Sequence, residues 1–337
     1  MYGADFDAAD RLFRTAACVN SPAPSFFVGL NLLWKALVQS DEGRITPLLI
    51  SRAEETIARA DKGIETPGRD VGTYFFWRGM GRSLRLAALF APQILEGEKR
   101  DFSLDGLLRG FSALTTLSAA RADFSEAAKR HPDLPDARSM GILLQQCNAP
   151  VIDSCITELW AHANENRWIE TEIKYILLNL VFNRHHLDDM GVRAIPLALE
   201  LHLRYPSNGL FHLALTKVSL ETGNLDECRS YASEIVSAPY ANLFGNEAHY
   251  LLGMADFGSH DYSEALKEFQ AVIIAAPSRP AYVLPWSYFR AAQCAVHLNE
   301  QKNAKSYLES ALRNSGASSN LRYAARRMLS EIVAASR

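Results

Sequence analysis

The chain has 337 residues, 48% of them hydrophobic and 22% charged, with a formal net charge of −3. This balance supplies ample apolar surface for a core but no strong positive field, so nucleic acid and anionic membranes are not expected partners. The most apolar stretch, residues 26–38, is interrupted by Asn31 and Lys35. No segment reaches the ~18 uninterrupted apolar residues that a membrane-spanning helix needs, and no membrane span is predicted.

The first expected element is a helix over residues 5–13, which ends before Pro22. Its pattern is typical of the second helix of a helical hairpin, so the chain is expected to begin in the middle of a repeat. The residues after Met1 lack the basic and apolar segments of a signal peptide, which favours the cytoplasm by default. The alternative is an exported or periplasmic protein from which an upstream signal has been removed.

Residues 1–174 are expected to form divergent helical hairpins. Apolar residues recur at i, i+3 and i+4, and no segment alternates between polar and apolar residues as a strand would. The polar stretches 61–73 and 96–104 are interpreted as loops between helices rather than domain boundaries. A helix through residues 123–128 should end near Pro132, because proline cannot continue a helix.

Four units of similar length follow, with starts separated by 34, 37 and 39 residues at Tyr175, Gly209, Asn246 and Pro285. The twentieth position of each unit is small, namely Ala194, Cys228, Ala265 and Ala304. Small side chains let two helices approach closely, and the apolar residues four and seven positions later lie on the same face. Residues 175–316 therefore indicate stacked antiparallel helix pairs, and residues 317–337 a C-terminal capping helix.

The unit 246–277 resembles the tetratricopeptide repeat family, with matching residues at Gly253, Tyr262, Ala265, Phe269 and Pro277. It departs from the family at His249 and His260, which stand where a large aromatic residue and a second glycine are usual. The resemblance is clearest over residues 175–316. It implies an all-α fold, a right-handed superhelical solenoid of antiparallel helix pairs, with residues 1–337 forming a single helical-repeat domain.

No motif in the sequence indicates catalysis, a cofactor or a metal. The cysteines are interpreted as small buried hydrophobic residues because they are widely spaced and lack a CxxC pair: Cys18, Cys147, Cys155, Cys228 and Cys294. Residues 79–81 (Gly-Met-Gly) lack the third glycine of a dinucleotide loop and indicate close helix contact instead. The adjacent residues His185 and His186 precede Asp188 and Asp189, which suit a helix N-cap better than a metal site. We expect no enzyme.

The resemblance implies that the first helices of successive units line a concave groove. The residues expected to face it are Asn179, Asn183, Leu213, Lys217, Tyr250, Met254, Phe257, Trp286, Phe289 and Gln293. Aromatic and methionine side chains on such a wall suit an apolar or aromatic peptide, and Asn179 and Asn183 could hydrogen-bond its backbone. The basic clamp with which some family members grip a terminal carboxylate is missing.

These features favour a non-enzymatic scaffold or adaptor that binds a protein or peptide partner in its concave groove. One alternative is a structural subunit that belongs to a larger assembly, for example at a bacterial envelope. The third reading is an enzyme or small-ligand receptor with a site between helices.

Overall fold

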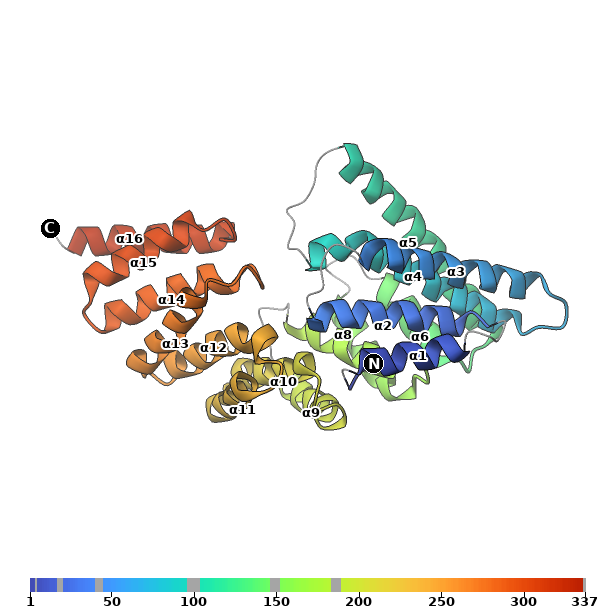
Figure 1. Cartoon of the computed structure of the whole chain (residues 1–337), viewed down its shortest axis with the longest axis horizontal. Coiled ribbons are helices and arrows are strands. Elements are labelled where there is room, and N and C mark those ends of the chain that lie inside the picture. Colours follow the sequence, from blue (N-terminus) through green and yellow to red (C-terminus); the bar gives the residue numbers. More distant parts are fainter. Residues whose placement is uncertain are drawn as a thin grey trace. The chain divides into compact units, whose positions relative to one another are not determined.

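The computed structural model describes residues 1–3, 5–16, 21–39, 45–95, 104–145, 152–182 and 189–335. Within these ranges the chain forms sixteen α-helices and one short 3-10 helix, with no β-strand (Figure 1). Within each of the two compact units described below, each helix packs on the next one along the chain. The all-α prediction is confirmed. None of the helices in the described part is both long and apolar enough to cross a membrane.

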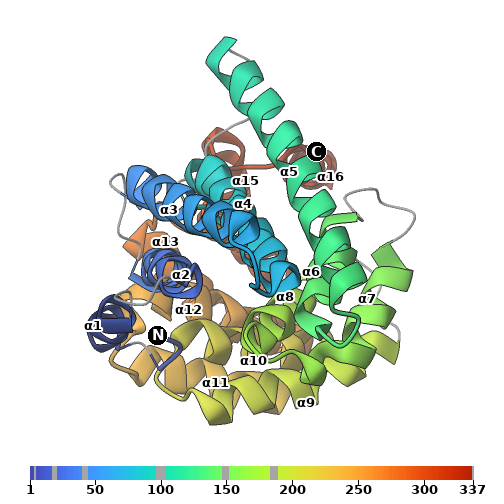
Figure 2. The same cartoon turned by 90° about the vertical axis from the view of Figure 1, so that its right-hand side faces the viewer.

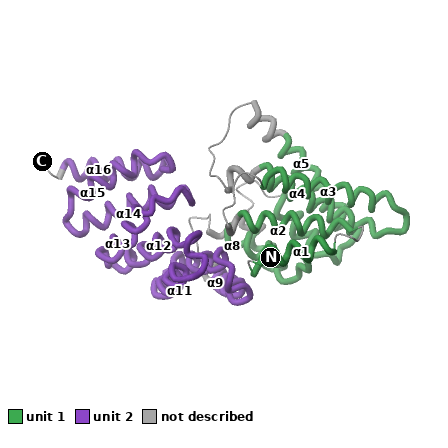
Figure 3. The backbone as a smooth tube through the Cα atoms, in the orientation of Figure 1, with its two compact units in different colours: residues 1–184 green, residues 185–337 purple. Residues whose placement is uncertain are grey.

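The chain divides into two compact units, residues 1–184 (unit 1) and 185–337 (unit 2; Figure 3). Unit 1 contains α1 (Phe6–Ala16), α2 (Ala23–Gln39), α3 (Ile45–Glu65), α4 (Val71–Leu95), α5 (Leu104–Arg130), α6 (Pro135–Gln145), α7 (Ile152–His162) and α8 (Glu170–Phe182). Unit 2 contains α9 (Asp189–Arg204), α10 (Gly209–Glu221), α11 (Leu225–Ser237), α12 (Ala241–Gly258), α13 (Tyr262–Ala275), α14 (Val283–His297), α15 (Gln301–Arg313) and α16 (Ser319–Ala335). The hairpin expected to start at Tyr175 is thus divided, with α8 in unit 1 and α9 in unit 2. The single-domain organisation stays a prediction.

Several expected elements of unit 1 have different bounds in the structure. The helix expected over residues 5–13 is α1. Helix α3 continues to Glu65, so the loop expected over residues 61–73 is shorter than its polar composition indicated. The segment 123–128 is the last part of the long helix α5, which ends at Arg130, just before Pro132. Most of the loop expected over residues 96–104 lies outside the described residues.

The core of unit 1 forms where α3, α4 and α5 pack side by side in sequence order (Figure 2). Phe76 of α4 contacts Phe124 of α5 and Trp168, with ring centroids 6.0 and 5.3 Å apart. Gly79 lies against the Phe124 ring, where an added Cβ would approach to within 2.8 Å. Gly81 likewise faces Ile57 on α3, at 2.9 Å from such a Cβ. The glycines at 79 and 81 therefore serve close helix contact, as the sequence indicated.

Two buried aspartates organise the polar interior of unit 1. Asp123 on α5 forms ion pairs with Arg78 and Arg82, both from α4, at 2.7 and 2.5 Å. Asp136, in the first turn of α6, is fully buried and accepts three backbone N–H groups just before α8. Buried carboxylates are costly unless each oxygen is paired, and both residues meet that condition.

In unit 2 the small residues expected at helix contacts are fully buried. Ala194, Cys228, Ala265 and Ala304 have no exposed surface. Asn208 and Asp261 begin the helices α10 and α13, because their side chains accept the backbone N–H groups of Leu210 and Glu264. Local capping and small contact residues therefore place the helix pairs where the repeat pattern predicted them.

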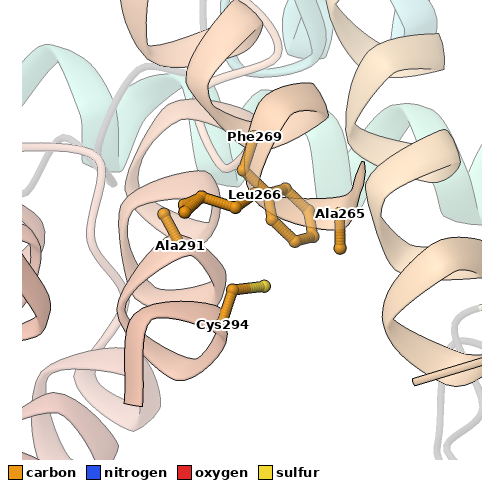
Figure 4. Close-up of a cluster of buried hydrophobic side chains, with 5 residues drawn as sticks. All are labelled: Ala265, Leu266, Phe269, Ala291 and Cys294. Atoms are coloured by element: carbon orange, nitrogen blue, oxygen red, sulfur yellow. The ribbon is translucent and has the colours of Figure 1, made fainter. Parts of the chain in front are cut away.

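A cluster of buried side chains joins α13 to α14 (Figure 4). Ala265, Leu266 and Phe269 come from α13, and Ala291 and Cys294 come from α14. The Phe269 ring also fills the space above Gly253 on α12, where a Cβ would come within 2.7 Å of it. One aromatic side chain thus packs against both neighbouring helices.

The expected C-terminal capping helix is α16, and it packs through Leu321 and Ala325. Arg322 lies beside them and reaches back to the end of α15. Its guanidinium donates to the carbonyls of Leu312 and Asn314, at 2.5 and 2.8 Å, and to that of Ala317 at 3.2 Å. The cation therefore lies at the C-terminal end of α15, where it interacts favourably with exposed carbonyls and with the helix dipole.

Replacing Arg322 with Gln should therefore lower the free energy of unfolding of unit 2 by about 1–2 kcal/mol, because three carbonyls lose a charged donor. Arg327→Gln is the control, since Arg327 is exposed and its ion pair is with the exposed Glu331. Urea denaturation of each variant measures the loss. Equal stability of the two variants would contradict this capping role.

Candidate functional site: the inner face of unit 2

The even-numbered helices of unit 2 form one layer. Besides their sequence neighbours, α10 packs on α12, α12 on α14, and α14 on α16. The odd-numbered helices α9, α11, α13 and α15 have no comparable contact with one another in the described part of the chain. In a curved stack, the layer whose members approach each other more closely lies on the inside. We call the side chains that link α10, α12 and α14 the inner face.

Glu247 on α12 forms a polar centre on this face. Glu247 is 5% exposed, and its carboxylate forms an ion pair with Lys217 Nζ on α10 at 2.7 Å. The hydroxyl of Tyr282, at the start of α14, donates to the same oxygen atom. Burial of that hydroxyl and the adjacent carboxylate both raise the pKa of Tyr282 well above its usual value. Glu247 therefore joins three helices through two donors.

Arg290 on α14 forms a second centre, enclosed by aromatic rings. Its guanidinium carbon lies 5.6 Å from the centroid of Phe257 and 5.7 Å from that of Trp286. Nη1 donates to Gln293 Oε1 at 2.8 Å, whereas Nε is buried without a hydrogen-bond partner. Tyr250 lies nearby: burial raises the pKa of its hydroxyl, and Arg290 opposes that shift. The guanidinium is thus held in position by two aromatic rings and a hydrogen bond.

The residues predicted for the groove form three groups: partly exposed residues of unit 2, buried residues of unit 2, and two asparagines of unit 1. Partly exposed side chains in unit 2 are Lys217, Tyr250, Met254, Phe257, Trp286 and Gln293. Leu213 and Phe289, in contrast, are 3% and 7% exposed and belong to the interior, so they offer no surface to a partner. Phe289 packs against Leu308 and Leu321 instead. The expectation that these two residues face the groove is corrected accordingly.

The two asparagines belong to unit 1. Asn179 lies on α8 in unit 1, is exposed, and donates to the carbonyl of Tyr175 one turn earlier at 2.8 Å. Asn183 lies outside the described residues, as do His185, His186 and Asp188. The polar part of the inner face is formed by the predicted Lys217 and Gln293 together with residues that the sequence analysis missed.

Glu247, Tyr282 and Arg290 were missed because no local pattern distinguishes them. Arg290 follows Trp286 by four residues, which places both on one side of α14, and this spacing was the only available signal. Glu247 looks like any solvated acidic residue of a helix. Its two partners are 30 and 35 residues away and are brought to it by packing alone.

Other reactive groups in the described residues have inert surroundings. Cys228 and Cys294 are buried free thiols, and burial raises the pKa of each to about 12. Thiolate is therefore scarce at neutral pH, and neither cysteine has the character of a nucleophile. No group of three histidine, cysteine or acidic side chains among these residues has the arrangement of a metal site.

Comparison with known proteins adds no family to this description. The sequence matches no protein-family model and no curated protein.

Proposed function

We propose that the chain is a non-catalytic adaptor and that the inner face of unit 2 binds a segment of a partner protein. The observation that carries this proposal is the pre-positioned Arg290, which is partly exposed between Phe257 and Trp286. Tryptophan, tyrosine and arginine dominate the binding energy of protein interfaces. Rings that hold an arginine in place reduce the entropy lost on binding.

The same geometry defines the chemistry of the segment. A partly exposed guanidinium is best paired with a carboxylate, which accepts charge-assisted hydrogen bonds. The rings of Trp286 and Phe257 and the thioether of Met254 favour an apolar side chain beside that carboxylate. Lys217 is already paired with Glu247, so it adds no second anion site. The proposed ligand is a peptide segment with one acidic residue next to a large apolar residue.

A variant with Trp286→Ala and Tyr250→Ala should bind such a segment roughly 10- to 100-fold more weakly, because two aromatic contacts are lost. The probe is a twelve-residue peptide selected on the full chain from a random display library, and fluorescence anisotropy measures its affinity. The control is Tyr323→Ala, which removes an exposed aromatic side chain from α16. Thermal unfolding of each variant shows whether the fold is retained.

A second comparison isolates the charge. Arg290→Gln should weaken the selected peptide but should have little further effect once the peptide's acidic residue is replaced by alanine. Equal affinity for the wild type and the aromatic double variant would refute the inner face as the binding site. Failure to select any peptide, together with self-association of the isolated chain on size exclusion, would refute the adaptor and favour a structural subunit.

A further inference from the structure

Two histidine side chains pack against each other in the interior of unit 2, where α9 meets α10. The ring of His202 on α9 lies 4.2 Å from that of His212 on α10, centroid to centroid, at an interplanar angle of 40°. His212 is 2% exposed. Its Nδ1 is hydrogen-bonded to the hydroxyl of Tyr240 at 2.8 Å. His212 Nε2 and His202 Nδ1 are both buried without a hydrogen-bond partner.

The groups around this pair offer little compensation for a positive charge. From α11, the ring of Tyr231 faces both imidazoles, at 6.5 Å from His202 and 6.0 Å from His212. An acidic oxygen of Glu234 on α11 lies 3.7 Å from His212 Nε2, and the Glu234 side chain is 55% exposed. That separation exceeds a hydrogen bond, and an exposed carboxylate is well screened by water. Burial, and then the charge of Glu227 on α11, raise the pKa of the Tyr231 hydroxyl.

The attachment of helix α9 depends mainly on its contact with α10. In the described residues its extensive packing is with α10. Ala194, Ala198 and Leu201 supply the apolar part of that contact, and the histidine pair supplies the polar part. A change at the two imidazoles therefore acts directly on the attachment of α9.

We infer that His202 and His212 form an acid-sensitive latch, which holds α9 on α10 while both rings are neutral and releases α9 when they take up protons. Two imidazolium ions cannot remain packed together at this distance in an interior that provides no buried counter-ion among the groups named above. Release exposes both rings to water, where the charged forms are stable. This regulation is independent of which partner the inner face binds.

The pH range of the latch follows from the titration of His212. Burial, and then the neighbouring His202, lower its pKa from 6.5 to about 4. Burial also lowers the pKa of His202, against the opposing effect of Glu234. The released state thus binds protons more readily than the attached state, so attachment is strongest above about pH 6.5 and weakens as the pH falls towards 4. Between pH 7 and pH 5, His212 alone should raise the opening equilibrium of α9 roughly 20-fold.

Hydrogen–deuterium exchange of the full chain at pH 7 and pH 5, corrected for intrinsic exchange rates, tests this inference. Peptides from α9 should lose protection by roughly 20-fold relative to peptides from α13, which serve as the internal reference. The variants His202→Gln and His212→Gln should each reduce this pH dependence, even where they lower the protection of α9 at both pH values. His297→Gln, which removes an exposed histidine from the same unit, should leave it unchanged.

Two results would overturn the latch. One is protection of α9 that changes between the two pH values no more than that of α13. The other comes from NMR of the histidine side chains in the wild-type chain, with the signal of His212 assigned by its loss in His212→Gln. A midpoint near pH 6.5 for that signal would show a solvated imidazole, whereas a midpoint below pH 5 supports the buried pair.

Discussion

Replacing Asp136 with alanine should lower the free energy of unfolding of unit 1 by about 4 kcal/mol, because three backbone N–H groups lose a charged acceptor and a cavity is left in the interior. Asp136 Oδ1 accepts from Trp168 and Ile169 at 2.9 and 3.1 Å, and Oδ2 accepts from Arg167 at 3.0 Å. These contacts fasten the start of α8 to the start of α6. Asp136→Asn keeps the shape and one acceptor, so its loss should be intermediate.

The measurement can be confined to unit 1. Four of the five tryptophans lie in residues 1–184, and a Trp286→Phe background removes the remaining one. Urea unfolding followed by tryptophan fluorescence then reports this unit alone. The control is Asp133→Ala, since the Asp133 side chain is 81% exposed and should contribute less than about 0.5 kcal/mol. A loss below about 1 kcal/mol for Asp136→Ala would show that these hydrogen bonds do not hold the fold.

The second large effect is expected at Phe269. This side chain is fully buried and packs on both α12 and α14, so Phe269→Ala should lower the free energy of unfolding of unit 2 by about 4 kcal/mol. Gly253→Ala should cost about 2 kcal/mol by the opposite mechanism, because its Cβ would press into the same ring. The double variant should lose about 1 kcal/mol less than the two single losses combined, since the new methyl group enters space that the ring has left.

Ile274 provides the matched control for this experiment. It lies one turn further along α13 but is 84% exposed, so Ile274→Ala should change stability by less than about 0.5 kcal/mol. Urea unfolding followed by circular dichroism compares the four variants. Strict additivity of Gly253→Ala and Phe269→Ala, or a loss at Ile274 equal to that at Phe269, would contradict the described contact.

The sequence predicted the positions of the helices better than the residues of the surface. Helix positions were predictable because the spacing of apolar residues and the capping of helix ends are local properties. The same holds for Ala265 and Ala304, whose small size has meaning only at a helix contact. The inner face was predicted less well. Leu213 and Phe289 belong to the interior of unit 2. The central positions of the inner face are occupied by the polar residues Glu247 and Arg290.

The amino-acid sequence by itself determined that the chain is helical and where the small contact residues stand, and it predicted the last helix, α16. Only the tertiary structure decided that α8 and α9 belong to different compact units, that Lys217 pairs with Glu247, and that His202 packs against His212. The physical reason is the separation along the chain between the residues that interact. A helix forms from interactions between residues three and four apart, whereas the burial and charge state of a side chain depend on whichever neighbouring helix covers it.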